Sequence, residues 1–257
     1  MLFFVVFFSY LLVLESLNWL VLTPLAWLRP TRRRDLIGTW LRLQTRIALG
    51  LARGLAGVRL VIRGKIEPTS CVVLMNHQSI FDILVGLSLV RGPYPLIPAR
   101  ASYAFGVPGI SSMIRLMRCP LLTQRPIPPR SELLALREAA DQVARGEQSL
   151  LIYPEGHRSP DGAMLPFMKP GLRLILRRTR ERPVYFVVVD GFAHLRLFRD
   201  TALRLAGTTG RVEVLGPYNT PAGDVELEAF LDSAWDRMAL ALALLRRGAP
   251  EPQSVDS

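Results

Sequence analysis

Apolar residues are distributed in two different ways along the chain. Residues 2–28 form one long apolar run that contains a single charged residue, Glu15. From residue 71 onward, short apolar runs alternate with longer segments in which apolar residues recur at helical spacing. The first pattern predicts a helix long enough to enter a bilayer, and the second predicts strands that alternate with helices.

The alternating region predicts the order of its strands and helices. Short apolar runs predict strands near 59–63 and at 71–75, 149–153, 184–189 and 211–215. Helical spacing predicts helices at 81–90, 132–145 and 224–247. Strands that alternate with helices favour a sheet with covered faces, so we predict an α/β fold with a mixed, largely parallel sheet. Helices should cover both faces of this sheet, and an N-terminal hydrophobic, membrane-anchoring helical segment should precede it.

The N-terminal apolar segment predicts a membrane anchor with either of two topologies. It is followed at once by Arg29 and the arginines at 32–34, which predicts that residues near 30 face the cytoplasm. Because Glu15, Asn18 and Pro24 interrupt the run, a re-entrant helical hairpin in one leaflet stands beside a transmembrane helix as an interpretation. A cleaved signal peptide fits less well, since the positive charge follows the apolar run instead of preceding it.

Basic residues accumulate next to this segment. Residues 36–63 contain five arginines and no acidic residue, among leucine, isoleucine and tryptophan. This pattern predicts a basic amphipathic helix at the level of the lipid headgroups, before the strand near 59–63. The alternative is an ordinary helix that packs on the core and leaves its arginine face in water.

Composition strengthens the membrane interpretation for a chain of the size of one catalytic domain. Hydrophobic residues make up 50% of the 257 residues, and the mean hydropathy of +0.26 is high for a soluble enzyme. Residues 1–66 hold ten Arg or Lys and two acidic residues, a balance of +8 out of a formal net charge of +11. No aromatic platform or recognition helix accompanies this charge, so we expect anionic lipid as a partner and no nucleic acid.

The two cysteines give no sign of metal binding or of a disulfide framework. Cys71 lies inside an apolar run, and Cys119 has no partner at metal-ligand spacing. We therefore expect reduced, structural thiols, which fits a domain that faces the cytosol.

The first candidate for chemistry follows the strand predicted at 71–75. In the stretch VLMNHQSIFD, Asn76 and His77 should emerge at the carboxyl end of that strand, where open α/β sheets place their sites, and the next helix supplies Asp82. A carboxylate can hold one imidazole nitrogen as N–H and leave the other to accept a proton. No Gly-x-Ser-x-Gly motif is present and Ser79 has no such turn around it, so the hydroxyl to be deprotonated would belong to a substrate. The alternative is a hydrogen-bonded structural histidine.

A second polar turn follows the strand predicted at 149–153. Pro154 and Gly156 predict a tight turn, and the guanidinium fork of Arg158 suits a phosphate monoester. Lys169 would add a second cation, and Glu155 would orient Arg158 or bind a polyol hydroxyl. The alternative is a surface ion pair between Glu155 and Arg158. If the strands run parallel, both polar turns should lie at the same edge of the sheet.

Together these residues resemble the glycerolipid acyltransferases, the family typified by 1-acylglycerol-3-phosphate acyltransferase. Asn76 and His77, with Asp82, match the Asn-His-x-x-x-x-Asp motif of the family, and residues 154–159 resemble its Pro-Glu-Gly-Thr-Arg-Ser block. The resemblance covers roughly residues 61–191 and the hydrophobic N-terminus. It implies that His77 is the general base, that Asp82 orients it, and that a thioester of coenzyme A or acyl carrier protein donates the acyl group.

The resemblance also implies which residues bind the acceptor. The block after the second strand holds the glycerol phosphate in this family, and two arginines resemble the basic ends of the family's middle motif. The predicted substrate-binding residues are therefore Asn76, Arg100, Arg125, Glu155, Gly156, Arg158 and Lys169.

Four departures from the family pattern leave the acceptor open. His157 stands where the family has threonine, and Met168 is inserted before the lysine of the block. Ser111 falls where a glycine follows the middle motif, and Phe186 replaces a proline in the last block. Because these blocks surround the headgroup of the acceptor, a lysolipid other than lysophosphatidic acid is an alternative acceptor.

The expected organisation is a membrane anchor at 1–58, an acyltransferase domain at 59–247 and a disordered tail at 248–257. We expect transfer of a fatty acyl group to 1-acylglycerol-3-phosphate at the membrane, with the active site facing the cytoplasm. No metal or cofactor is expected apart from the acyl-CoA or acyl carrier protein thioester as co-substrate. The wall of an apolar acyl tunnel is expected within 103–122. A hydrolase and a non-catalytic membrane lipid-binding protein remain alternatives.

Overall fold

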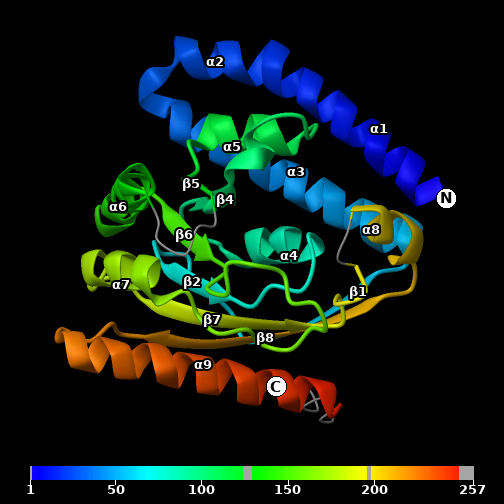
Figure 1. The fold of residues 1–257 in the computed structure, drawn as a ribbon. Coiled ribbons are helices and arrows are strands. Elements are labelled where there is room, and N and C mark those ends of the chain that lie inside the picture. The colour runs from blue at the N-terminus through cyan, green and yellow to red at the C-terminus, as the bar shows by residue number, and fades with distance from the viewer. Residues whose placement is uncertain (1, 124–128, 196–197, 249–257) are drawn as a thin grey trace, which may run out of the picture.

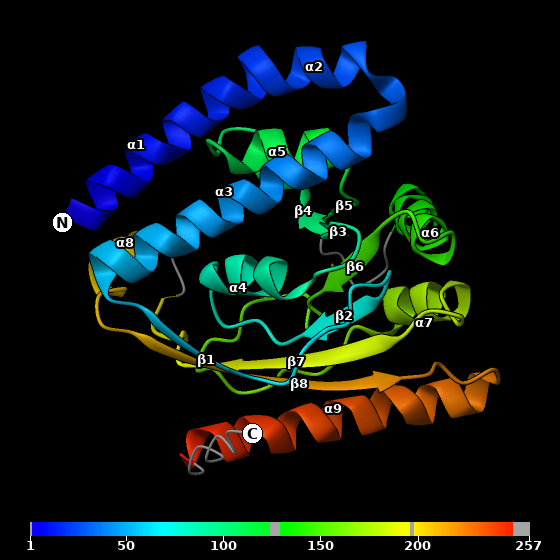
Figure 2. The same ribbon diagram turned by 180° about the vertical axis from the view of Figure 1, so that it is seen from behind.

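The fold is a six-stranded sheet between layers of helices. A computed structural model describes residues 2–123, 129–195 and 198–248. Helix α9 (Asp224–Arg246) covers one face of the sheet, and α4 (Phe81–Leu89) covers the other, with α3 (Arg33–Ala56) above it (Figures 1 and 2). The outermost layer, beyond α3, is formed by α1 (Leu2–Leu17) and α2 (Thr23–Leu28).

The remaining elements are shorter and complete these layers. The strands of the main sheet are β1 (Arg59–Arg63), β2 (Val72–Met75), β3 (Pro95–Leu96), β6 (Ser149–Ile152), β7 (Val184–Asp190) and β8 (Thr209–Tyr218). A second, two-stranded sheet consists of β4 (Ala99–Arg100) and β5 (Leu121–Leu122). The other helices are α5 (Ile110–Met117), α6 (Arg130–Ala144), α7 (Lys169–Arg178) and α8 (Phe198–Arg204). Single turns of π-helix (Asn18–Leu22) and 3₁₀-helix (Pro30–Arg32 and Ala101–Ala104) connect some of them.

The main sheet has the strand order β1-β8-β7-β2-β6-β3, and β2 lies near its centre. The pairings of β1 with β8, β2 with β7, β2 with β6 and β3 with β6 are parallel, whereas β7 and β8 are antiparallel. Because β2 and β6 run in the same direction as neighbours, the turns that follow them emerge at the same edge of the sheet. This edge is where the two polar motifs of the sequence meet.

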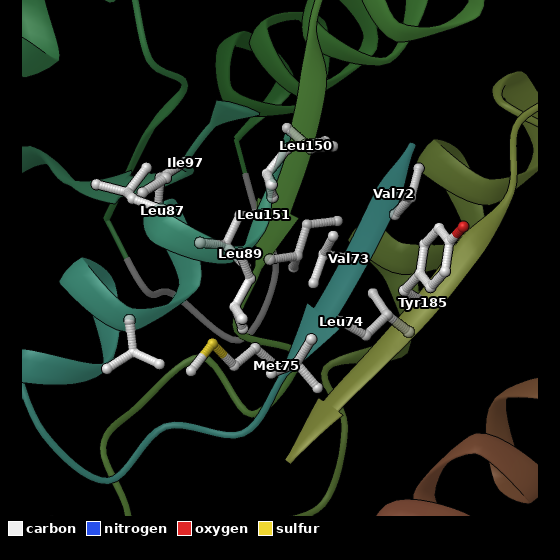
Figure 3. Packing of buried hydrophobic residues seen from close by; sticks show 14 of the residues in the cluster. Val72, Val73, Leu74, Met75, Leu87, Leu89, Ile97, Leu150, Leu151 and Tyr185 are labelled. Carbon is white, nitrogen blue, oxygen red and sulfur yellow. The ribbon is translucent and has the colours of Figure 1, made fainter. Parts of the chain in front are cut away.

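Strand β2 is buried on both faces, which explains its unbroken apolar run. On one face it packs under α4, and Figure 3 shows Val73, Met75 and Leu151 lying together beside this helix. Gly86 of α4 permits the close approach, since an added Cβ would lie 2.6 Å from a methyl carbon of Leu151 and 3.0 Å from the sulfur of Met75. The tight contact fixes the start of α4 above the end of β2.

The predicted fold class is confirmed, and the differences concern short helices. The sheet is mixed and largely parallel, helices cover both faces, and an apolar helix lies at the N-terminus. Helices α5, α7 and α8 were not predicted from the apolar pattern. In α7 the early residues Pro170 and Gly171 weigh against a helix by propensity, although proline is well tolerated in a first turn. Residues 249–257 of the tail predicted to be disordered lie outside the described residues.

The N-terminal apolar helix lies against the domain along one side. Residues Val5–Leu28 are long and apolar enough to cross a membrane, which is compatible with membrane association but weak evidence when taken alone. The side chains of Leu11, Leu14 and Leu22 are buried against the domain, while others such as Leu20 and Trp27 are exposed. The helix therefore presents an apolar outer face, and exposure of this face to water is unfavourable.

Helix α3 turns back beneath this helix and belongs to the hydrophobic core. Its residues Ile37, Leu41 and Ala52 are buried within the same core cluster as β2, and α3 contacts both α1 and α4. Arg42 donates hydrogen bonds to the carbonyl oxygens of Val90 and Gly92, so this arginine fastens the loop after α4. The helices within residues 2–58 thus share one core with the sheet and with α4.

The polar residues that interrupt the N-terminal apolar run are hydrogen-bonded inside the domain. The side chain of Asn18 is fully buried, donates to Ser112 Oγ of α5 at 2.9 Å, and accepts from Trp40 Nε1 at 2.8 Å and Gln44 Nε2 at 3.1 Å in α3. Glu15 accepts a hydrogen bond from the same Ser112 hydroxyl at 2.6 Å. These bonds join three helices, and they explain how an apolar helix accommodates an amide and a carboxylate.

We expect Asn18→Ala to lower the free energy of unfolding by about 2–4 kcal/mol, because it leaves several buried donors and acceptors without a partner. The measurement is urea-induced unfolding of the protein in detergent. Ser16→Ala is the control, since this exposed hydroxyl bonds only the Leu12 carbonyl of its own helix. Equal effects of the two substitutions would show that the buried bonds do not hold the helix in place.

Candidate active site

The turns that follow β2 and β6 are joined by main-chain hydrogen bonds. The amide of Ser159 donates to the carbonyl oxygen of His77 at 2.8 Å. In the opposite direction, the amide of His77 donates to Glu155 Oε1 at 2.9 Å. The parallel pairing of the two strands therefore brings the two polar motifs into direct contact, as the sequence predicted.

His77 and Asp82 form a hydrogen-bonded pair at this edge. The His77 Nδ1 atom lies 3.2 Å from Asp82 Oδ2, and the carboxylate is fully buried. The same Oδ2 atom accepts hydrogen bonds from the amides of Gln78 at 2.6 Å and Ser79 at 2.7 Å. Because Asp82 lies in the first turn of α4, its charge also faces the positive end of that helix. With Nδ1 turned to the carboxylate, Nε2 is the nitrogen left to accept a proton.

Tyr153, the residue after β6, packs on the face of the imidazole. The two ring centroids are 4.1 Å apart with an interplanar angle of 26°. Burial and the nearby Asp82 carboxylate raise the pKa of Tyr153 well above its usual value, so its hydroxyl stays protonated. Within the described part of the chain, the Tyr153 hydroxyl and Asp82 Oδ1 are buried without a hydrogen-bond partner. The sequence pattern marked Tyr153 only as the end of a strand and gave no signal for this stacking.

Asn76 extends the sheet by means of its side chain. Its Nδ2 donates to the carbonyl oxygen of Val189 at 2.9 Å, and its Oδ1 accepts from the amide of Val189 at 2.7 Å. The side chain is buried and fully engaged with β7. Contact between Asn76 and a substrate stays a prediction, and the two hydrogen bonds to Val189 hold the start of the turn that carries His77.

Glu155 also binds main chain, and so the proposed surface ion pair with Arg158 is wrong. Its side chain is 3% exposed, and its second oxygen accepts from the amide of Leu165 at 2.7 Å. Burial, together with the charge of Asp82, raises the pKa of Glu155 to about 7 against two hydrogen bonds that lower it. The carboxyl group therefore ties the loop at 163–168 to the turn that carries His77. Its predicted contact with the acceptor stays a prediction.

A cavity of about 850 Å³ opens beside His77 and extends under the N-terminal helix. Its inner wall is apolar and is built from several helices. The lining residues include Leu14 of α1, Leu41 of α3, Leu84 of α4, Ile114 of α5, Leu136 of α6 and Ile175 of α7. The part of the wall expected within 103–122 is present. The sequence pattern did not indicate that α1, α3 and α4 would complete it, because nothing local predicts which helices face one another.

Cationic side chains line the same cavity on its polar side. Arg100 and Arg158 both line it, and Arg158 Nη2 lies 3.4 Å from the hydroxyl oxygen of Tyr103. Arg100 is exposed and has no charged partner within the described residues. His157, the departure from threonine, is exposed and also lines the cavity. Arg125 lies outside the described residues.

The Lys169 side chain pairs with two carboxylates of α9, and its predicted contact with the acceptor stays a prediction. The ammonium group lies 2.6 Å from Asp232 Oδ1 and 3.3 Å from Glu228 Oε2. These two carboxylates raise the pKa of Lys169, and their negative charges balance its positive charge. The residue still lines the cavity, but its charge is directed to the last helix.

Gly156 is required by both conformation and packing. Its φ of +72° lies in the left-handed region, and an added Cβ would lie 2.2 Å from the sulfur of Met168. The inserted Met168 therefore packs directly on this turn. Among the described residues, no three His, Cys, Asp or Glu side chains converge as ligands for a metal ion.

Comparison with known proteins gives a consistent result. The family model described as Acyltransferase matches residues 59–190. The chain is 35% identical over 101 residues to a chloroplastic 1-acyl-sn-glycerol-3-phosphate acyltransferase of Brassica napus, covering 39% of this chain and 28% of that one. It is 29% identical over 145 residues to the 1-acyl-sn-glycerol-3-phosphate acyltransferase of Pseudomonas aeruginosa, covering 56% and 53%. The matched segments span about half or less of the length of these curated relatives.

A solved structure supports the fold over nearly the whole chain. The crystal structure of the 1-acyl-sn-glycerophosphate (LPA) acyltransferase PlsC from Thermotoga maritima superposes with a TM-score of 0.67 at 20% sequence identity. The superposition covers 96% of this chain and 98% of that one. The similarity includes the N-terminal helices as well as the sheet, since so little of either chain is left out.

We expect the raised pKa of Glu155 to appear in the pH dependence of stability. The folded state binds this proton more tightly than the unfolded state, whose carboxyl keeps the usual value of 4.5. The stabilisation is therefore complete below about pH 4.5 and is lost as the pH rises through about 7. The free energy of unfolding, measured against that of Glu155→Gln, should fall over this interval and level off above it.

Glu138→Gln is the control for this titration, since it removes the same charge from an exposed position of α6. A difference between wild type and Glu155→Gln that grows between pH 4.5 and 7 would mean that the two amide hydrogen bonds outweigh burial, contrary to the assigned direction.

Proposed function

The chain belongs to the acyltransferase family, and we propose that it transfers a fatty acyl group from a thioester to the free hydroxyl of a lysophospholipid. The acceptor we propose is 1-acylglycerol-3-phosphate, and the product is then phosphatidic acid. One observation carries this proposal. An imidazole held by a buried carboxylate borders a cavity whose lining is mostly apolar and includes two arginines, Arg100 and Arg158.

The proposed reaction is a direct transfer assisted by a general base. His77 Nε2 takes the proton from the acceptor hydroxyl as the oxygen attacks the thioester carbonyl carbon. The C–O bond forms, the carbonyl oxygen takes up negative charge, and the C–S bond then breaks. The leaving thiolate receives the proton from the imidazolium. The Asp82 carboxylate stabilises the imidazolium in between, and no acyl-enzyme is formed.

The walls of the cavity suit the two ends of a lysophospholipid. Apolar side chains from the helices that line the cavity would surround an acyl chain. Burial of the acyl chain is favourable by about 25 cal/mol per Å² of apolar surface removed from water. Arg100 and Arg158 would hold the phosphate, to which a guanidinium can donate two parallel hydrogen bonds. Long acyl chains and lysolipids partition into bilayers, so the exposed apolar face of the N-terminal helix fits an enzyme that works at a membrane surface.

Several finer points belong to the proposal. The donor is a thioester of coenzyme A or of acyl carrier protein, and no further cofactor enters the reaction. The arginines after residue 28 favour an active site that faces the cytoplasm. The oxyanion is expected to be held by backbone N–H groups of one of the two turns.

Two other functions would use parts of the same site. A hydrolase would use the same pair with water as the acceptor, and it would release free fatty acid. A non-catalytic lipid-binding protein would use the cavity and the apolar face but would not depend on a base paired with an acid. The His77–Asp82 pair favours an enzyme over the lipid-binding protein, and the arginines that line the cavity favour an acceptor with a phosphate over water.

His77→Ala is expected to reduce acyl transfer by about a factor of 10² to 10⁴, the usual contribution of a general base, while folding is preserved. The assay supplies the protein in detergent with labelled acyl thioester and a lysolipid, and it separates diacyl lipid from free fatty acid. His194→Ala is the matched control, because this exposed histidine bonds the Arg204 carbonyl and Thr208 and does not line the cavity. Free fatty acid as the main product of the wild type would exclude the transferase.

Arg158→Ala is expected to raise the KM for phosphate-bearing acceptors by about tenfold, the loss of one charge-assisted contact. An uncharged acceptor such as a monoacylglycerol should be affected much less. Arg137→Ala, which removes the same charge from an exposed position of α6, is the control. If charged and uncharged acceptors lose equally, Arg158 does not bind the phosphate.

A further inference from the structure

The residue after His77 is a buried glutamine with three hydrogen bonds. The Gln78 side chain is fully buried. Its Nε2 donates to the carbonyl oxygen of Gly162 and to Asp190 Oδ1, both at 3.2 Å, and its Oε1 accepts from the amide of Phe192 at 3.3 Å. Since the amide of Gln78 also donates to Asp82, the placement of this one residue affects both members of the His77–Asp82 pair.

Arg246, in the last turn of α9, shares both acceptors of the Gln78 amide. Its Nη2 donates to the carbonyl oxygen of Gly162 at 2.7 Å, and its Nε donates to Asp190 Oδ1 at 3.3 Å. Two donors thus bind the same pair of acceptors from two sides. The planar guanidinium suits this arrangement, because its N–H groups point in fixed directions toward a carbonyl and a carboxylate at once.

The turn that contains Gly162 is closed around this contact. Gly162 has a φ of +83°, and an added Cβ would lie 2.8 Å from Arg246 Nη2 and 2.9 Å from the Cβ of Ala193. Ser159, at the start of the turn, donates its amide to the carbonyl of His77. The turn at 159–163 is therefore held at one end by the catalytic turn and at the other by the last helix.

We propose that Arg246 is a positioning residue for the His77–Asp82 pair and acts through Gln78, Asp190 and the turn at 159–163. The inference rests on the proposed acyl transfer. Asp190 is mostly buried, with a side-chain exposure of 14%, so its charge needs a partner. Without the guanidinium, the single amide of Gln78 is the remaining side-chain donor to both acceptors among the described contacts. Gln78 then shifts toward the uncompensated carboxylate, and the catalytic turn shifts with it.

The anchoring of α9 does not depend on Arg246. The helix packs on the sheet through buried apolar residues, among them Leu227, Leu231 and Met238. The Arg246 side chain is 41% exposed. Replacing it should leave the helix in place and change mainly the position of the turns that it contacts.

The experiment compares Arg246→Ala with Arg247→Ala, which removes the same charge from the next, exposed residue. Arg246→Ala should lower kcat by about tenfold, because small displacements of a base are costly, with the KM values for thioester and lysolipid within about twofold of wild type. Millimolar ethylguanidine should restore part of this kcat, and it should not affect Arg247→Ala. Arg246→Lys should recover little, since an ammonium cannot reach both acceptors with fixed geometry.

A second measurement is independent of activity. Amide hydrogen exchange of peptides that cover 76–82 and 159–163 should become faster in Arg246→Ala and stay unchanged in Arg247→Ala. Unchanged exchange, or a kcat of Arg246→Ala equal to that of Arg247→Ala, would overturn the proposal. If the wild type itself fails to transfer acyl groups, the proposed function fails, and the exchange data still decide whether Arg246 positions the turn. If Arg246→Ala does not fold, Arg246→Lys, which keeps the length of the side chain, replaces it with the same expected exchange.

Discussion

The buried carboxylate of Asp82 is the group on which the geometry of the site depends. One of its oxygens receives two main-chain amides and the imidazole of His77. A charge without water is costly unless donors surround it, so the turn between β2 and α4 can only adopt a shape that points its amides at this oxygen. The direction of the imidazole follows from that shape. Tyr153 then restricts the ring from its face.

Most of the polar residues in the two motifs hold this arrangement together. Asn76 binds β7, Glu155 binds the main chain of two loops, and Gln78 binds the turn at 159–163. These side chains are buried and satisfied by protein groups. The polar side chains of the two motifs that line the cavity are fewer and include His77, His157 and Arg158. A motif with five or six polar residues can therefore contain a small chemical part and a larger structural part.

Local sequence pattern predicted the parts of this site that depend on neighbours along the chain. The apolar runs of β2 and β6 and the pairing of His77 with Asp82 follow from segments of a few residues. The partners of Lys169 could not be predicted, because its acidic neighbour Asp232 lies 63 positions away. The partner of Asn18 could not be predicted either, because Ser112 lies 94 positions away. Without a known partner, this polar residue argued against a simple apolar helix. Which side chains satisfy a buried polar group is decided by tertiary packing.

The N-terminal helices link the exposed apolar face of the molecule to the cavity beside His77. They share the hydrophobic core of the domain and form part of the cavity that begins at His77. A lipid acceptor could therefore remain partly in contact with the bilayer while its hydroxyl reaches the imidazole. This arrangement explains why an apolar segment carries buried, hydrogen-bonded polar residues on its inner side.

The most direct measurement is a crystal structure of the protein with a lysophospholipid bound in the cavity. The account predicts that the free hydroxyl lies about 2.6–3.2 Å from His77 Nε2 and that the phosphate contacts Arg158 or Arg100. A hydroxyl on the other side of the Asp82-bound ring, or a phosphate bound away from both arginines, would contradict the claim that His77 removes the proton from a lipid alcohol.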